Sequence, residues 1–434
     1  MNYQESVAYL YSLGNEVLAM KLGLENISKL LAALGDPEKN YLKVQIAGTN
    51  GKGSTVAFLE AICVAAEIRV GATTSPHLIS VTERVRIGGA KISEKEFAEY
   101  ATRVRKTSES LVEIGELETA PTYFEQVTAI ALLAFAEAKI ELAILETGLG
   151  GRFDATTAAR AEIVALTPID YDHQAILGET LAEIAAEKAA IIRANTKVVV
   201  APQKNEAEKV INGKCREVGI EPIYASENYK IKTDSEILPS LYATFHTPND
   251  DYKNVMPSLL GRHQFQNAAT AIAIAEILRE FDFSIPKFAI ISGLENAKHQ
   301  GRLEFYRGIL FDGAHNVAGA KALREHLDEF VRQPITMIFG AMRDKELTEI
   351  AAVLFPRAAR LILTEPKNER SMKIEEILKC VPSDFTGEKV YAAKTVEEAI
   401  AKAREISGGG EHLILVTGSL YLVGEAQEIL RNSF

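Results

Sequence analysis

The sequence of 434 residues contains no tryptophan and only three cysteines, Cys63, Cys215 and Cys380. The cysteines are far apart and form no CxxC pair, so neither a disulfide framework nor a cysteine-based zinc site is expected. Cys63 falls in an apolar helical pattern, which predicts a small core residue. Internal repeats and low-complexity tracts are also missing.

The sequence lacks an apolar run long enough to cross a membrane. Its longest apolar stretch, residues 128–145, is interrupted by Glu137, Lys139 and Glu141. The N-terminal residues have neither the basic nor the apolar part of a signal peptide. We therefore expect a cytoplasmic protein with no membrane partner.

An excess of positive charge is missing as well. The 48 Lys and Arg residues stand against 59 Asp and Glu residues, which gives a net charge of −11. A generally acidic surface argues against nucleic acid as the main partner, although a local basic pocket for phosphates remains possible. The apolar fraction of 47% and the charged fraction of 25% are those of an ordinary globular protein.

Short apolar runs alternate with helical patterns along the chain, which predicts a mostly parallel sheet covered on both faces. In the first half, the predicted strands are residues 44–47, 142–145, 163–166 and 198–200. In the second half, they are residues 309–311, 335–339, 361–363 and 413–416.

The two series of strands predict two α/β domains. Residues 1–296 are expected to form a P-loop-containing domain with a mostly parallel sheet, which starts with about 40 helical residues. Residues 297–434 are expected to form a smaller, Rossmann-like α/β domain. Between the two series, the polar stretch 203–254 is predicted as peripheral strands and loops, and residues 292–300 as a connection.

A glycine-rich loop follows the strand at 44–47 and precedes a helical pattern. It consists of Gly48, Thr49, Asn50, Gly51, Lys52, Gly53 and Ser54. Glycines allow the backbone N–H groups to approach a phosphate, and the following helix adds the positive end of its dipole. Lys52 supplies a charge for the β- and γ-phosphates. The strict P-loop pattern is not met, because Gly53 separates Lys52 from Ser54.

Further polar residues follow other predicted strands. Glu146 ends the strand at 142–145, where a carboxylate can hold a metal beside phosphates. His173 follows the strand at 163–166 and is either a structural histidine or a ligand. A rival interpretation of residues 148–151 as a dinucleotide turn is weak, because the full G-x-G-x-x-G spacing is missing. Lys188, taken alone, is expected to be an exposed helix lysine.

The second half has a polar group of its own. Asp312 ends the strand at 309–311, where a carboxylate can accept hydrogen bonds from a ribose, and His315 follows it. Arg302 is either a phosphate clamp or part of a surface salt bridge, and the sequence alone favours the salt bridge.

These motifs together resemble the folylpolyglutamate synthase and dihydrofolate synthase family of Mur-type ligases. The similar segments occur in the family's order and span nearly the whole chain: residues 22–25, 47–55, 75–78, 82–87, 124–125, 146–156, 172–174, 187–188, 301–304, 312–316 and 416–424. The sequence departs from the family at His299-Gln300, where Trp-Pro often precedes Gly-Arg.

The resemblance implies roles for individual residues. Mg²⁺, in two sites, would be bound by Ser75, Glu146 and His173, and Lys188 would be carbamylated. ATP would contact Asn267, Arg302 and Asp312 between the domains. The glutamate and folate sites would include Phe124, Phe153, Asp154, His315 and Ser419.

The implied reaction is the ATP-dependent ligation of L-glutamate to dihydropteroate or to reduced folates such as tetrahydrofolate species, in a monomer. Lys52, Lys188 and His315 would assist catalysis. Alternatives are a Mur-type ligase for a UDP-sugar peptide, a non-ligase P-loop ATPase, and a nicotinamide-binding Rossmann protein.

Overall fold

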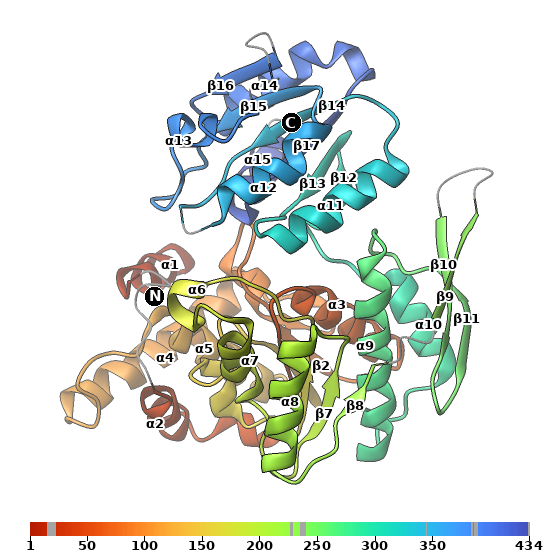
Figure 1. Cartoon of the computed structure of the whole chain (residues 1–434). Coiled ribbons are helices and arrows are strands. Elements are labelled where there is room, and N and C mark those ends of the chain that lie inside the picture. Colours follow the sequence, from red (N-terminus) through yellow and green to blue (C-terminus); the bar gives the residue numbers. More distant parts are fainter. Residues whose placement is uncertain are drawn as a thin grey trace.

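The structure, a computed structural model, describes residues 1–14, 23–225, 229–234, 240–343, 345–382, 385 and 389–432. Residues 15–22 of the predicted N-terminal helical region lie outside this range. The chain forms two α/β units, each with its own sheet, and the unit built from the second half of the chain lies above the other in Figure 1.

The first sheet has eight strands in the order β4-β3-β2-β5-β1-β6-β7-β8. Its parallel part comprises β1 (Leu42–Ala47), β2 (Val70–Thr73), β5 (Leu142–Glu146), β6 (Ile163–Leu166), β7 (Lys197–Val200) and β8 (Ile223–Tyr224). The short strands β3 (Arg86–Ile87) and β4 (Ala90–Lys91) extend one edge in antiparallel fashion. All four strands predicted for the first half are confirmed, and each is almost wholly buried, as parallel strands covered on both faces require.

Helices cover both faces of this sheet. They are α1 (Tyr3–Ser12), α2 (Glu25–Ala33), α3 (Lys52–Ala65), α4 (Glu94–Glu113), α5 (Tyr123–Glu137), α6 (Gln174–Leu177), α7 (Leu181–Ala189), α8 (Asn205–Glu217), α9 (His263–Leu278) and α10 (Lys287–Asn296). The helix predicted after the glycine-rich loop is α3, which packs against α9 and α10 and buries Cys63 completely.

Two predicted segments differ from the structure. The polar stretch 203–254 contains α8 besides β9 (Tyr229–Asp234), β10 (Ser240–His246) and β11 (Asp251–Val255), which form a separate antiparallel sheet. In α8, Ala207, Ile211 and Cys215 recur every fourth residue and are buried, while polar residues cover the other faces. The predicted connection 292–300 begins within α10, which buries Gly293 and Leu294.

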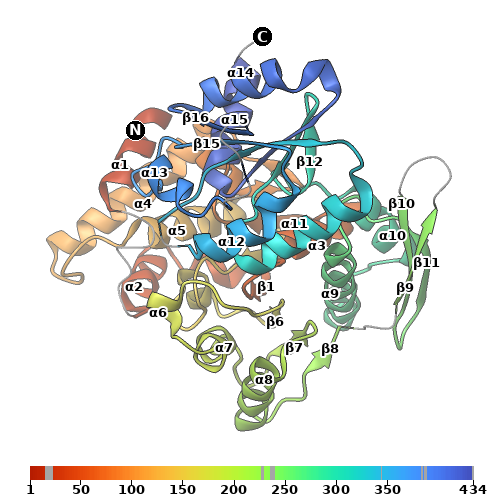
Figure 2. The same cartoon turned by 45° about the horizontal axis from the view of Figure 1, so that its top comes forward.

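The second sheet has the order β12-β13-β17-β14-β15-β16. Its strands are β12 (Glu304–Tyr306), β13 (Ile309–Asp312), β14 (Ile335–Phe339), β15 (Arg360–Thr364), β16 (Val390–Ala393) and β17 (Leu413–Thr417), and only β12 is antiparallel. Helices α11 (Val317–Phe330), α12 (Leu347–Leu354) and α13 (Ile374–Leu378) contribute to the core on one face, and α14 (Val396–Ile406) and α15 (Leu420–Asn432) to that on the other (Figure 2). This is the doubly wound fold that the sequence predicts.

Among the helices that the structure describes, none has both the length and the apolar character of a membrane-spanning segment.

Candidate active site

The glycine-rich loop connects β1 to the N-terminus of α3. Gly48 has a φ of +149° and Gly51 a φ of +85°, values that residues with a side chain rarely adopt. A Cβ atom at Gly48 would collide with the Thr167 hydroxyl, and one at Gly51 with the Asn267 side-chain oxygen. The backbone of the loop therefore lies close to Thr167, which follows β6, and to Asn267 of α9.

Two lysine side chains reach this loop. Lys52 donates from Nζ to the carbonyl oxygens of Gly48 at 3.0 Å and Thr49 at 3.2 Å. Lys188, at the end of α7, is 5% exposed and donates from Nζ to the Gly48 carbonyl at 3.0 Å. The exposed position expected for Lys188 from its helix alone is thus wrong. Burial, together with the charge of Lys52, lowers the pKa of Lys188 to about 7.

Glu146, at the end of β5, lies near Gly53 of the loop. Its side chain is buried, and Oε2 accepts a hydrogen bond from the backbone N–H of Ser75 at 3.2 Å. Burial raises the pKa of Glu146, and the charge of Lys52 opposes this shift. A Cβ atom at Gly53 would lie 3.5 Å from Oε2, which places the carboxylate against the loop.

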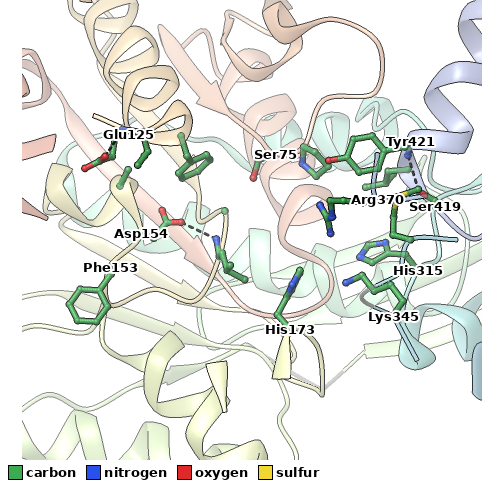
Figure 3. Close-up of a pocket in the computed structure, with 18 of the residues that line it drawn as sticks. Ser75, Glu125, Phe153, Asp154, His173, His315, Lys345, Arg370, Ser419 and Tyr421 are labelled. Carbon is green, nitrogen blue, oxygen red and sulfur yellow. Dashed lines mark hydrogen bonds between the residues drawn. The ribbon is translucent and has the colours of Figure 1, made fainter. Parts of the chain in front are cut away.

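His173 follows β6 and approaches the same region. It has a φ of +52° and precedes α6, and its ring lines a cavity together with Ser75 (Figure 3). Ser75 lines this cavity and also a second cavity; of these two cavities, Glu146 lines only the second and His173 only the first. Within the described ranges, no group of three His, Cys, Asp or Glu residues could hold a metal by itself.

The second half of the chain contributes Arg302, which precedes β12, and Asp312, which ends β13. The Asp312 carboxylate is buried and accepts backbone hydrogen bonds from Leu303 at 3.0 Å and Ala314 at 2.9 Å. Burial raises the pKa of Asp312, and the charge of Arg302 opposes this. Arg302 donates to the Gly313 carbonyl at 3.3 Å and lines the second cavity, of about 740 Å³, with Glu146, so the surface salt bridge favoured from sequence is wrong.

His315 lies in the loop after β13. Its Nδ1 is 2.7 Å from the Gly313 carbonyl oxygen, so Nδ1 carries the proton and donates. Burial, together with the charge of Lys345, lowers the pKa of His315 to about 4. The ring is therefore neutral near pH 7, with the Nε2 lone pair available to another donor.

The cavity that contains His173 has a volume of about 170 Å³ and lies between the two sheets (Figure 3). The first half of the chain contributes Phe124, Phe153 and Asp154 to its lining, and the second half contributes His315, Lys345, Arg370, Ser419 and Tyr421. Among these, Asp154 already accepts hydrogen bonds from the backbone N–H groups of Leu149 and Thr156. The wall on the first side is thus partly aromatic, and that on the second side carries cations.

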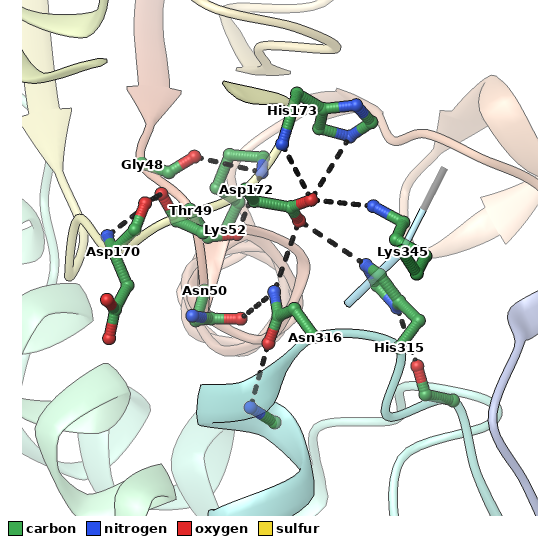
Figure 4. A network of polar contacts seen from close by, with 12 residues as sticks. Gly48, Thr49, Asn50, Lys52, Asp170, Asp172, His173, His315, Asn316 and Lys345 are labelled. Atoms are coloured by element: carbon green, nitrogen blue, oxygen red, sulfur yellow. Dashed lines mark hydrogen bonds and ion pairs between the residues drawn. The ribbon is translucent and has the colours of Figure 1, made fainter. Parts of the chain in front are cut away.

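Sequence reasoning assigned no role to several residues of this region. Asp172 accepts a hydrogen bond from Lys345 at 2.6 Å and one from Asn316 at 3.2 Å (Figure 4). Lys345 and Arg370 follow β14 and β15, at the same edge of the second sheet as His315. Their position after predicted parallel strands is the signal that could have pointed to them.

Comparison with known proteins is consistent with this geometry. The Mur ligase middle domain matches residues 46–275, and the Mur ligase glutamate ligase domain matches residues 301–420. The dihydrofolate synthase/folylpolyglutamate synthase of Bacillus subtilis is 33% identical over 440 residues, which cover 99% of each chain. This chain belongs to the folylpolyglutamate and dihydrofolate synthase family of Mur ligases.

Solved structures of this family have the same fold. A Mycobacterium tuberculosis folylpolyglutamate synthase complexed with ADP is similar with a TM-score of 0.89, 27% identity and 98% coverage of each chain. Escherichia coli FolC in complex with DHPP and ADP is similar with a TM-score of 0.86 and 27% identity, over 99% of this chain and 98% of that one. The family and the fold predicted from sequence are thereby confirmed.

Proposed function

We propose that this protein uses ATP to join L-glutamate to dihydropteroate, to the glutamyl tail of reduced folates, or to both. One observation carries this proposal: the cavity with an aromatic wall and a cationic wall shares Ser75 with the second cavity, which Gly53 of the phosphate loop lines together with Glu146 and Arg302. The names of two relatives, each a dihydrofolate synthase/folylpolyglutamate synthase, support the same function.

ATP would bind with its phosphates on the loop Gly48–Ser54. The loop's N–H groups, the start of α3 and Lys52 offer positive charge to the β- and γ-phosphates. Asn267 lies against Gly51, and Arg302 lines the second cavity together with Gly53 of the loop. The Asp312 carboxylate accepts a hydrogen bond from the backbone N–H of Leu303, the residue after Arg302. We therefore assign these three side chains to the nucleotide.

Magnesium would be held by Ser75, Glu146 and His173, as their donor types allow. When bound, it neutralises phosphate charge, so that an anionic carboxylate can approach the γ-phosphate. A carbamate on Lys188 would add a carboxylate beside Gly48 and help to organise a second metal position. The buried, easily deprotonated amine of Lys188 supports this modification.

The acceptor and glutamate would bind against opposite walls of the cavity shown in Figure 3. Phe124 and Phe153 offer flat apolar faces for a pteridine, with Asp154 beside them. His315, Lys345, Arg370 and Ser419 offer cations and hydrogen bonds for the carboxylates of glutamate.

The reaction would have two steps. A carboxylate oxygen of the acceptor attacks the γ-phosphate, which gives an acyl phosphate and ADP. The amine of glutamate then attacks the acyl carbon, phosphate leaves, and the amine loses a proton. Enclosure of the cavity between the two sheets would limit hydrolysis of the acyl phosphate.

We also propose that the domains divide at residues 296 and 297, just after α10, and that the protein acts as a cytoplasmic monomer. The separate hydrophobic cores of the two sheets support the boundary. Gel filtration with light scattering tests the monomer.

An ADP-release assay with each acceptor, with and without glutamate, tests the function, and mass spectrometry of the products identifies the amide. Product formation with a pteridine acceptor that requires glutamate is the expected result. ATP hydrolysis without an amide product would indicate a simple ATPase, and turnover only with a UDP-sugar peptide would indicate another Mur ligase. Calorimetric binding of NAD would favour the nicotinamide alternative.

A further inference from the structure

Asp172 occupies the centre of a polar network that joins the two halves of the chain (Figure 4). It lies in the loop after β6, and its side chain is 10% exposed. Its Oδ1 accepts from Lys345 Nζ at 2.6 Å and from the backbone N–H of His173 at 2.9 Å. Its Oδ2 accepts from Asn316 Nδ2 at 3.2 Å. Three donors from three different loops therefore converge on one carboxylate.

The ion pair with Lys345 differs from the surface ion pairs of this protein. The Lys345 side chain is 7% exposed, and it lines the cavity assigned above to glutamate. A buried pair is screened little by solvent and keeps a defined geometry, whereas surface pairs are often mobile. Lys345 uses one of its three N–H donors for Asp172, which leaves two for another acceptor.

The carboxylate itself is held in place from both halves of the chain, because His173 belongs to the first half and Asn316 to the second. The backbone N–H of His173 binds Oδ1, and Asn316 binds Oδ2 while it also donates to Asn50 Oδ1 of the phosphate loop at 3.0 Å. The position of Lys345 is therefore defined relative to the phosphate loop, although Lys345 belongs to the other sheet.

We infer that Asp172 is a positioning residue that orients the Lys345 ammonium toward the incoming glutamate and fixes it relative to the phosphate loop. The flexible lysine is ordered before glutamate arrives, so the ligand does not bear the entropic cost of ordering it. This inference rests on the proposed function, since it takes Lys345 as a ligand of glutamate.

A double-mutant cycle tests this inference. Asp172→Asn removes the charge but keeps the shape, and Lys345→Met removes the ammonium but keeps most of the stem. We expect each single variant to lower kcat/KM for glutamate about tenfold or more, mainly through KM, and to change KM for ATP less than about threefold. If Asp172 acts through Lys345, the double variant is no worse than Lys345→Met alone.

The matched control is Glu329→Gln. Glu329 of α11 pairs with Arg262, just before α9, at 2.7 Å, so it also links the two halves but lies outside the cavity. The activity of the Glu329→Gln variant should stay within about twofold of the wild type. This result would show that loss of a contact between the two halves does not by itself cause the effect of Asp172→Asn. Asp172→Glu, which keeps the charge but displaces it, gives a second cycle if Asp172→Asn does not fold.

Two results would overturn the inference. Losses that multiply in the double variant would show that Asp172 acts independently of Lys345. A lower KM for glutamate in Asp172→Asn would show that Asp172 competes with glutamate for the ammonium. A wild-type protein without glutamate-dependent turnover would instead contradict the proposed function, so the two failures are distinguishable.

Discussion

Lys52 and Lys188 share one acceptor, because each ammonium lies 3.0 Å from the carbonyl oxygen of Gly48. Lys52 is the first residue of α3, and Lys188 lies at the end of α7. Burial and the nearby charge of Lys52 favour the neutral amine of Lys188, whose pKa is lowered to about 7. A lysine in this state is a nucleophile at physiological pH.

The first prediction concerns carbamylation of Lys188. The neutral amine adds to the carbon of CO₂ and releases a proton, so the carbamate should increase as the pH rises through about 7. The neutral fraction is about a tenth at pH 6 and about nine tenths at pH 8. With ¹³C-bicarbonate, we expect a carbamate resonance in NMR that is stronger at pH 8. Lys204→Ala, which removes an exposed lysine, should retain it, and Lys188→Ala should lose it.

The second prediction is that Lys188→Ala lowers turnover by tenfold or more and that added bicarbonate does not restore it. The alanine removes the amine that carries the carbamate, so CO₂ has no site of attachment. Initial rates with and without bicarbonate measure the effect. Near-wild-type turnover of this variant would argue against a carbamate at Lys188.

The third prediction concerns Glu146. Glu146→Gln keeps the size of the side chain but removes a charge that hard cations require, so the Mg²⁺ concentration for half-maximal ADP release should rise by about tenfold or more. Mn²⁺ binding in the presence of ADP, measured by electron paramagnetic resonance, should weaken in parallel.

Glu60→Gln is its matched control. Glu60 lines the same cavity as Glu146 but forms an ion pair with Arg86 at 2.8 Å. Its substitution should leave the Mg²⁺ requirement unchanged. An unchanged requirement in Glu146→Gln would exclude Glu146 as a ligand.

Much of the fold could be predicted because local signals agree with it. The buried strands β1, β5, β6 and β7 appear in the sequence as short apolar runs, and a glycine-rich loop precedes α3. The helix α8 was missed because its buried face is narrow and its composition is polar. The helical periodicity of its apolar residues, rather than its polar composition, is the signal that predicts this helix.

The site was only partly predictable, for a physical reason. Residues at the ends of strands, such as Glu146 and Asp312, can be placed at a sheet edge from one half of the chain alone. The burial of Lys188 and the pair of Asp172 with Lys345 depend on how distant segments meet, 140 residues apart for Lys188 and Gly48 and 173 apart for the pair. Only the resemblance to the family assigned a role to Lys188.

The fourth prediction concerns the ionisation of His315. Burial keeps its ring neutral, the charge of Lys345 lowers its pKa further, and the Asp172 carboxylate opposes this. Lys345→Met should therefore raise the pKa of His315 above about 4, and Asp172→Asn should lower it. Histidine NMR titrations measure both shifts. A shift of the same sign in both variants would contradict the electrostatic arrangement of Figure 4.

The fifth prediction concerns the aromatic wall of the cavity. A Cβ atom at Gly148 would lie 2.5 Å from Cζ of Phe124, so Gly148→Ala must displace the ring. Overpacking of this kind costs about 1–3 kcal/mol, which corresponds to a factor of about 5–150 if the ring binds the pteridine. We therefore expect KM for the pteridine acceptor to rise, with little change in KM for ATP.

Two further variants decide whether this effect acts through Phe124. Gly213→Ala, where a Cβ atom meets nothing within 4 Å, should leave the kinetics unchanged. Phe124→Leu removes the edge of the ring that collides with the added methyl group. If the pteridine stacks on Phe124, the Leu variant loses affinity by itself and Gly148→Ala adds no further loss to it. An additive loss would place the pteridine elsewhere in the cavity.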